Sequence, residues 1–218
     1  MLFSAFLGGF LLIYASSPSR HSRMLPWIVG RGLGLAGYLA LTALVLLGTW
    51  FSHPWRFRRS ILHPAVQLRV HAVLAAGTLV LVAGHVLAMV VDRYAHVGFT
   101  GALVPGTSGY RPTAVALGTV ALYLGLAAGA SAALAGRFLI RHRWLAVHRF
   151  AAAVFALAWF HGVLAGSDTP ALRAVYALTG LAVLFLTATR LTARAPEARG
   201  GPPGDVVPVA PARPGASS

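Results

Sequence analysis

Long apolar runs separated by short polar connections dominate the chain. They cover residues 2–15, 27–51, 66–91, 113–135, 145–165 and 171–189. The last five approach or exceed the roughly 20 residues that a helix needs to cross a bilayer, so they predict membrane-spanning helices. The first run is short, but it lacks the positive start of a secretory signal because the first charged residue is Arg20. We expect a short transmembrane helix there, with a signal segment as the alternative.

The same pattern divides the chain into three parts. Residues 1–26 are expected to form the short first span and a loop, residues 27–191 the main membrane domain, and residues 192–218 a disordered tail. The tail is rich in Pro, Gly, Ala and Arg and has no apolar period. A segment of that length is too short for a flavin or nicotinamide domain of ordinary size. The expected fold class is an all-α integral membrane protein with six transmembrane helices.

Composition narrows the chemistry that the chain can carry. The 218 residues are 57% hydrophobic and 10% charged, and the mean hydropathy is +0.73. There is no cysteine, which excludes disulfides, iron–sulfur clusters and thiolate ligation and leaves histidine as the strong metal ligand. The net charge of +14 comes entirely from arginine, but the arginines lie between apolar spans. Membrane lipid is therefore the expected partner, and no nucleic acid is expected.

The arginines also predict which connections face the cytoplasm. They cluster before the third span, before the fifth span and after the sixth, as Arg56, Arg58, Arg59, Arg137, Arg141, Arg143, Arg190, Arg194 and Arg199. The connections at 92–111 and 166–170 carry fewer arginines and should face outward. Arg20 and Arg23 run against this rule but are outnumbered. Both chain termini are therefore expected in the cytoplasm.

Four histidines lie inside two of the predicted spans, His71 with His85 and His148 with His161. At about 1.5 Å per residue each pair spans roughly 20 Å, which fits within the ~30 Å hydrocarbon layer. Fourteen residues make four turns less about 40°, so the first pair faces one side. Thirteen residues fall about 140° short of four turns, so we expect tilt, a bulge or irregular winding near His148. The two spans are parallel, which pairs His71 with His148 on the inside and His85 with His161 on the outside.

Imidazole is a common axial ligand of haem iron, and ionisable groups at membrane depth are usually functional. Two layers of histidines would suit two haems, one above the other. Small residues beside them leave room for a flat macrocycle, namely Ala75, Ala76, Gly77, Gly84, Ala151, Ala152 and Gly162. The alternative is that these histidines form hydrogen bonds between helices or lie at the interface. We attribute the glycines at 30–37 to close packing between helices. A nucleotide-binding glycine motif follows a strand, and no strand is expected before these residues.

Other residues are weaker candidates for the same site. Arg69 and Arg149 flank the inner histidines, and Arg111 lies outside; each would neutralise haem propionates or extend to lipid headgroups. Phe155 lies midway between His148 and His161, where it would fill the space between haems or belong to the core or lipid face. The remaining histidines fall in loops and are expected to be solvated or interfacial: His21, His53, His63, His96 and His142. Of these, His142 is the substitute if His148 is not a ligand.

The third span reads HAVLAAGTLVLVAGH and the fifth RWLAVHRFAAAVFALAWFH. With the six-span layout, these segments resemble the ferric reductase-like transmembrane domain shared by ferric reductases, NADPH oxidases and the haem-binding subunit of the methionine sulfoxide reductase system. The unequal steps of fourteen and thirteen residues match that family. RGLGLAGYLALTALVLLG and HGVLAGSD also look like bacterial members, so the resemblance covers about residues 27–190. It implies the plasma membrane of a bacterium.

The resemblance implies that His71, His85, His148 and His161 are axial ligands of two b-type haems, and that the protein transfers electrons across the membrane. The flavin and nicotinamide domains of the family are not expected in this chain. The electron donor is then a separate cytoplasmic flavoprotein or a quinol, and the acceptor lies outside. Two functions remain as alternatives. One is reduction of Fe(III) or oxygen at the outer face, near Asp168 or His96, and the other is a non-redox transporter or scaffold with a histidine proton relay.

Overall fold

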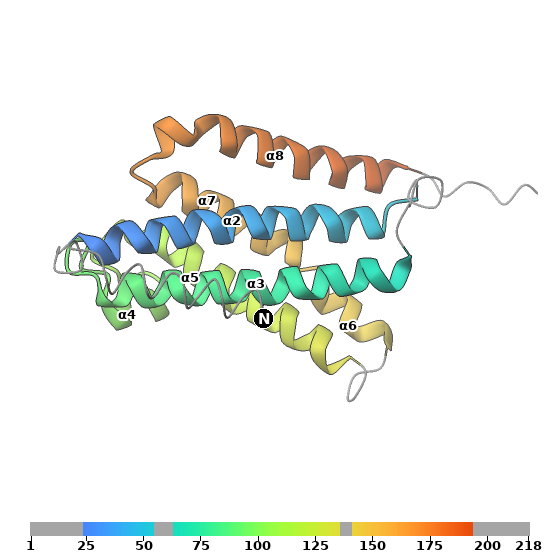
Figure 1. Ribbon diagram of the computed structural model, residues 1–218, viewed down its shortest axis with the longest axis horizontal. Coiled ribbons are helices and arrows are strands. Elements are labelled where there is room, and N and C mark those ends of the chain that lie inside the picture. Colours follow the sequence, from blue (N-terminus) through green and yellow to red (C-terminus); the bar gives the residue numbers. More distant parts are fainter. Residues whose placement is uncertain (1–23, 55–62, 136–140, 194–218) are drawn as a thin grey trace, which may run out of the picture.

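The computed structural model describes residues 24–54, 63–135 and 141–193, without the side chains of residues 141–144. Every regular element in these residues is a helix (Figure 1): α2 (Leu25–Phe51), α3 (Pro64–Val91), α4 (Gly98–Leu103), α5 (Pro112–Leu134), α6 (Arg141–His148), α7 (Ala151–Ala165) and α8 (Thr169–Thr192). The four longest, α2, α3, α5 and α8, begin with proline in their first two positions, where its missing N–H costs nothing. The predicted first span at 2–15 and nearly all of the predicted tail lie outside the described residues.

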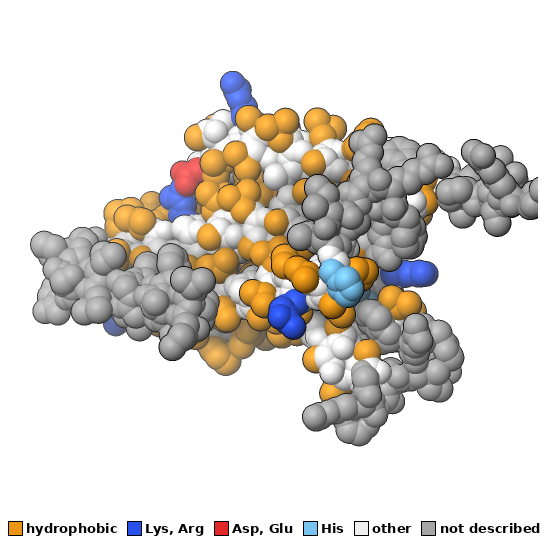
Figure 2. Space-filling model, turned by 45° about the vertical axis from the view of Figure 1, so that its right-hand side comes forward, with side chains coloured by type: hydrophobic (Ala, Val, Ile, Leu, Met, Phe, Trp, Pro, Cys, Tyr) orange, Lys and Arg blue, Asp and Glu red, His pale blue; other side chains and the backbone are white. Residues whose placement is uncertain are grey.

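Within the described residues, five segments are long and apolar enough to cross a membrane: Leu25–Phe51, Pro64–Val91, Pro112–Leu134, Leu145–Ala165 and Thr169–Thr192. They match five of the six predicted spans to within a few residues at each end. Large apolar side chains point outward along them, as with Leu68 at 67% exposed and Leu191 at 75% exposed. Figure 2 shows hydrophobic side chains spread over the visible face of the bundle. A surface of this kind suits lipid, and the chain is a multi-pass membrane protein.

Successive long helices alternate in direction, so that α2, α5 and α8 run one way and α3 and α7 the other (Figure 1). The third and fifth predicted spans are therefore parallel, as expected. Helix α2 packs closely along α3, with Gly37 beside Val82 and Gly30 beside Met89. Helix α5 packs in the same antiparallel manner along α7. The short helix α4, which the sequence did not predict, lies in the connection from α3 to α5.

A buried cluster joins α2 and α7 to α8. It consists of Tyr38, Val45, Phe155, Tyr176 and Val183. The Tyr38 hydroxyl forms a hydrogen bond with the Thr179 hydroxyl of α8, which satisfies a phenol that is only 8% exposed. This contact fixes α8 to the outside of the α2–α7 pair.

The predicted irregularity near His148 is confirmed. Helix α6 ends at His148, two residues form a turn, and α7 begins at Ala151. A straight helix would carry His148 and His161 on different sides. The break allows both side chains to reach the same cavity.

Candidate functional site

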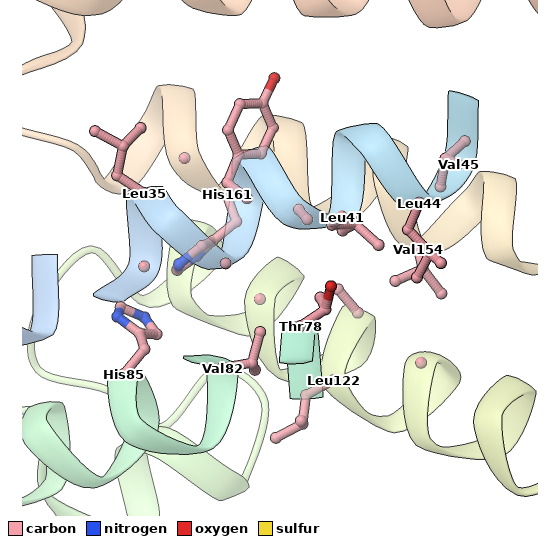
Figure 3. Close-up of a pocket in the computed structure, with 18 of the residues that line it drawn as sticks. Leu35, Leu41, Leu44, Val45, Thr78, Val82, His85, Leu122, Val154 and His161 are labelled. Carbon is pink, nitrogen blue, oxygen red and sulfur yellow. The ribbon is translucent and has the colours of Figure 1, made fainter. Parts of the chain in front are cut away.

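A cavity of about 940 Å³ runs between α2, α3, α5, α6 and α7, and α4 and α8 also contribute side chains to its wall. Its wall is mostly aliphatic, with Leu35, Val82 and Leu122 among the side chains that Figure 3 labels. All four histidines of the predicted pairs line it. A volume of this size lies at the upper end of the range of about 300–1,000 Å³ for ligand sites.

His85 and His161 form one layer of the cavity, with ring centroids 6.2 Å apart and an angle of 75° between the rings. The Nδ1 of His85 lies 2.7 Å from the Gly30 carbonyl oxygen, and the Nδ1 of His161 lies 2.7 Å from the Ala114 carbonyl oxygen. A carbonyl only accepts, so in each ring Nδ1 carries the proton and donates. In the neutral ring Nε2 keeps its lone pair. Figure 3 shows the two imidazoles pointing toward each other.

His71 and His148 form the other layer, with ring centroids 6.1 Å apart and an angle of 65°. The Nδ1 of His148 is 3.5 Å from the Ala128 carbonyl oxygen, a long contact. The Nδ1 of His71 is buried and has no hydrogen-bond partner within the described part of the chain. The structure therefore brings together both predicted pairs, but it anchors the His85–His161 layer more firmly.

Three glycines provide the space in which these rings lie. A Cβ added at Gly34 would be 2.8 Å from the Nδ1 of His85, one at Gly118 would be 2.7 Å from the Nδ1 of His161, and one at Gly48 would be 3.1 Å from the Cε1 of His71. The sequence interpretation assigned the glycines at 30–37 to helix packing alone. A signal was present, since Gly34 and Gly48 are fourteen residues apart, the same step as His71 to His85 on the antiparallel neighbour.

The small residues predicted to leave room for a macrocycle divide into two groups. Four of them line the cavity: Ala75, Ala151, Ala152 and Gly162. The other three, Ala76, Gly77 and Gly84, are not among its lining residues. A Cβ added at Gly84 would instead lie 3.0 Å from the Cδ1 of Leu33, while one at Gly77 would meet nothing within 4 Å.

Of the three arginines predicted to face propionates, only Arg149 lines the cavity. Arg69 is exposed on α3 and is not among the lining residues. Arg111 donates a hydrogen bond to the Leu164 carbonyl and lies over the Tyr110 ring at 5.5 Å. For Arg69 and Arg111 the propionate prediction is not supported, because neither side chain reaches the cavity.

Two arginines that the sequence interpretation missed do line the cavity. Arg31 lies at the His85–His161 end, is paired with the Asp168 carboxylate and sits over the Trp27 ring at 5.6 Å. Arg190, in the last turn of α8, lines the cavity as well. Arg31 was detectable, because it is the only charged residue in the 27–51 apolar run, and a lone charge at such a position is usually functional.

Phe155 does not fill the space between the two layers. It is 5% exposed, lies in the buried cluster at 6.1 Å from the Tyr38 ring, and is absent from the cavity lining. The core alternative is therefore correct for this residue, because α7 turns it toward α2 and α8. Thr78 on α3 and Val154 on α7 (Figure 3) line the cavity instead, and each lies about midway in sequence between the two histidines of its span.

One loop histidine contradicts the expectation of solvation. His53 is 1% exposed, stacks on Trp50 at 5.9 Å and has its Nε2 3.4 Å from the Thr189 hydroxyl, so it joins the end of α2 to α8. His63 and His96 are exposed, as predicted. His63 also accepts the Ala65 N–H at the start of α3. His21 and the side chain of His142 lie outside the described residues.

Each layer offers two imidazoles, and within the described ranges no group of three or more His, Cys, Asp or Glu side chains converges on one point. Comparisons with protein-family models, with curated proteins and with solved structures found no match to this chain.

Proposed function

We propose that the chain binds two b-type haems, one in each histidine layer, and transfers electrons across the membrane as a member of the ferric reductase-like transmembrane family. The observation that carries this proposal is the presence of two facing imidazole pairs in one apolar cavity.

The spacing of the rings fits a metal between them. Imidazole nitrogens bind transition-metal ions at about 2.0 Å, and the ring centroid lies roughly 1.1 Å behind the nitrogen, so two imidazoles on opposite sides of one ion have centroids about 6 Å apart. The observed separations are 6.1 Å and 6.2 Å. Each histidine pair would supply two nitrogens to the metal of a planar macrocycle such as a porphyrin, and the macrocycle would supply the remaining ligands.

The hydrogen bonding of the His85–His161 layer also supports ligation. A metal-bound histidine usually donates its other ring N–H to a carboxylate or backbone carbonyl, which fixes the tautomer and the ring orientation. His85 and His161 do so through Nδ1 at 2.7 Å each. Their Nε2 lone pairs are then available to a metal.

Three cationic side chains line the cavity and would pair with the carboxylates of a porphyrin. Arg31 lines the cavity at one end, and Arg149 and Arg190 line it as well. Guanidinium groups form strong, often bidentate hydrogen bonds with carboxylates. We assign these three residues, in place of Arg69 and Arg111, to the anionic groups of the ligands.

When bound, each haem supplies an iron that takes up and releases one electron. The histidines of α3 hold the two layers roughly 21 Å apart, since fourteen residues rise about 1.5 Å each. In this proposal a reduced flavoprotein or a quinol on the cytoplasmic side is oxidised, and an acceptor on the opposite side is reduced, one electron at a time.

Haem content tests the proposal directly. The full chain, expressed with sufficient haem and purified in detergent, is expected to contain about two b-type haems with low-spin spectra. His96→Asn is the control, because His96 is exposed, lies outside the cavity, and has a φ of 53° that asparagine tolerates. A haem-to-chain ratio near zero would refute the proposal and favour the non-redox proton relay.

A further inference from the structure

The same hydrogen-bonded contact occurs in both helical hairpins of the cavity. In the α2–α3 hairpin His85 donates from Nδ1 to the Gly30 carbonyl, and the residue four positions after that carbonyl is Gly34. In the α5–α7 hairpin His161 donates from Nδ1 to the Ala114 carbonyl, and four positions later comes Gly118. The two contacts have the same length, 2.7 Å.

Helix geometry explains why glycine follows each carbonyl by four residues. The carbonyl of residue i accepts the N–H of residue i+4 and keeps a second lone pair. The Cβ of residue i+4 is tilted toward the N-terminus of the helix, over that carbonyl. A Cβ at Gly34 or Gly118 would lie 2.8 Å or 2.7 Å from the imidazole Nδ1, closer than the 3.0 Å that real Cβ contacts respect. Any larger residue would cover the carbonyl and displace the ring.

We infer that Gly34 and Gly118 are positioning residues for the His85–His161 layer: each exposes one backbone carbonyl to the facing imidazole and thereby fixes Nδ1 as the protonated nitrogen. Nε2 is left facing the cavity. The consequence for haem binding rests on the proposed function, but the consequence for the tautomer does not. Both glycines therefore act through a histidine rather than on a ligand.

The other layer provides an internal contrast. Gly48 lies opposite His71 in the same register, but the nearest ring atom is Cε1 and the Nδ1 of His71 has no hydrogen-bond partner in the described part of the chain. The tautomer of His71 is not set by a carbonyl in this way. Effects of Gly34 and Gly118 should therefore be confined to the His85–His161 layer.

The experiment measures tautomers and haem in the same samples. The full chain, labelled with ¹⁵N-histidine and reconstituted in lipid nanodiscs, is reduced with dithionite so that any six-coordinate haem iron is diamagnetic. Ring nitrogen shifts, assigned with His85→Ala and His161→Ala, then report which nitrogen carries the proton. Wild type is expected to show Nδ1–H for both residues. Gly34→Ala should change the signals of His85, and Gly118→Ala those of His161. Each should reduce low-spin haem from about two to about one per chain.

Gly77→Ala is the matched control, because Gly77 lies on the same helix as His85, is not in the cavity lining, and would place its Cβ in open space. Gly77→Ala should change neither the histidine tautomers nor the haem content. Unchanged tautomers in both cavity variants, or Nε2–H rings in the wild type, would overturn the inference. The wild-type measurement needs no variant, so Nε2–H rings would still overturn the inference even if both glycine variants fail to fold. Nδ1–H rings without haem would refute the proposed function and leave the positioning role intact.

Discussion

Removing histidines singly and in pairs gives a quantitative test of the two layers. The rings within each layer lie 6.1 Å or 6.2 Å apart, whereas the layers are separated by about 21 Å along α3. Two imidazoles that share one iron are both required for low-spin, six-coordinate haem. Each single substitution to alanine should therefore lower low-spin haem from about two per chain to about one.

The double substitutions distinguish layers from independent sites. The double variant His85→Ala with His161→Ala removes both ligands of one layer, so the number of low-spin haems per chain should remain near one. His71→Ala with His85→Ala removes one ligand from each layer, so it should fall to zero. The effects of substituting two residues that act as a unit are non-additive in this way, whereas the effects of substitutions at separated sites add.

The assay combines haem extraction, which gives total haem per chain, with low-temperature EPR of the oxidised protein, which counts low-spin centres. Thermal unfolding in detergent shows that each variant is folded. Loss of all low-spin haem in the same-layer double variant, or one remaining centre in the cross-layer double variant, would contradict two separate layers. Either result would mean that the pairing of rings seen in the structure is not the pairing of ligands.

Three further predictions concern charge, packing and topology. Arg31→Gln should lower the reduction potential of one of the two centres in a redox titration, because loss of a nearby positive charge favours the oxidised iron, while Arg111→Gln should leave both potentials unchanged. Phe155→Ala should destabilise the fold by about 3–5 kcal/mol in denaturation experiments, as expected for a buried aromatic ring, whereas Phe185→Ala, on a side chain that is 66% exposed, should cost far less. A tag after Ser218 should resist protease in right-side-out vesicles, and cleavage without membrane disruption would reverse the orientation deduced from the arginines.

The sequence alone predicted five spans that the structure describes as helices, because apolar runs of about 20 residues have few other solutions in lipid. It also predicted the pairing of His71 with His148 and of His85 with His161, since parallel spans place residues at matching depth. The thirteen-residue step even indicated the break near His148. These properties follow from the length and period of single helices and from the alternating direction of successive spans.

Which side chains face the cavity was decided only by the tertiary structure. Arg69 and Phe155 are close in sequence to cavity histidines, yet the rotation of α3 and α7 turns them to other surfaces. Arg31 and Gly118 reach the cavity because α2 and α5 pack against the histidine helices in one particular register. Such contacts depend on the angle and offset between helices, which the apolar period of a membrane span does not fix, because lipid accepts an apolar helix on every side.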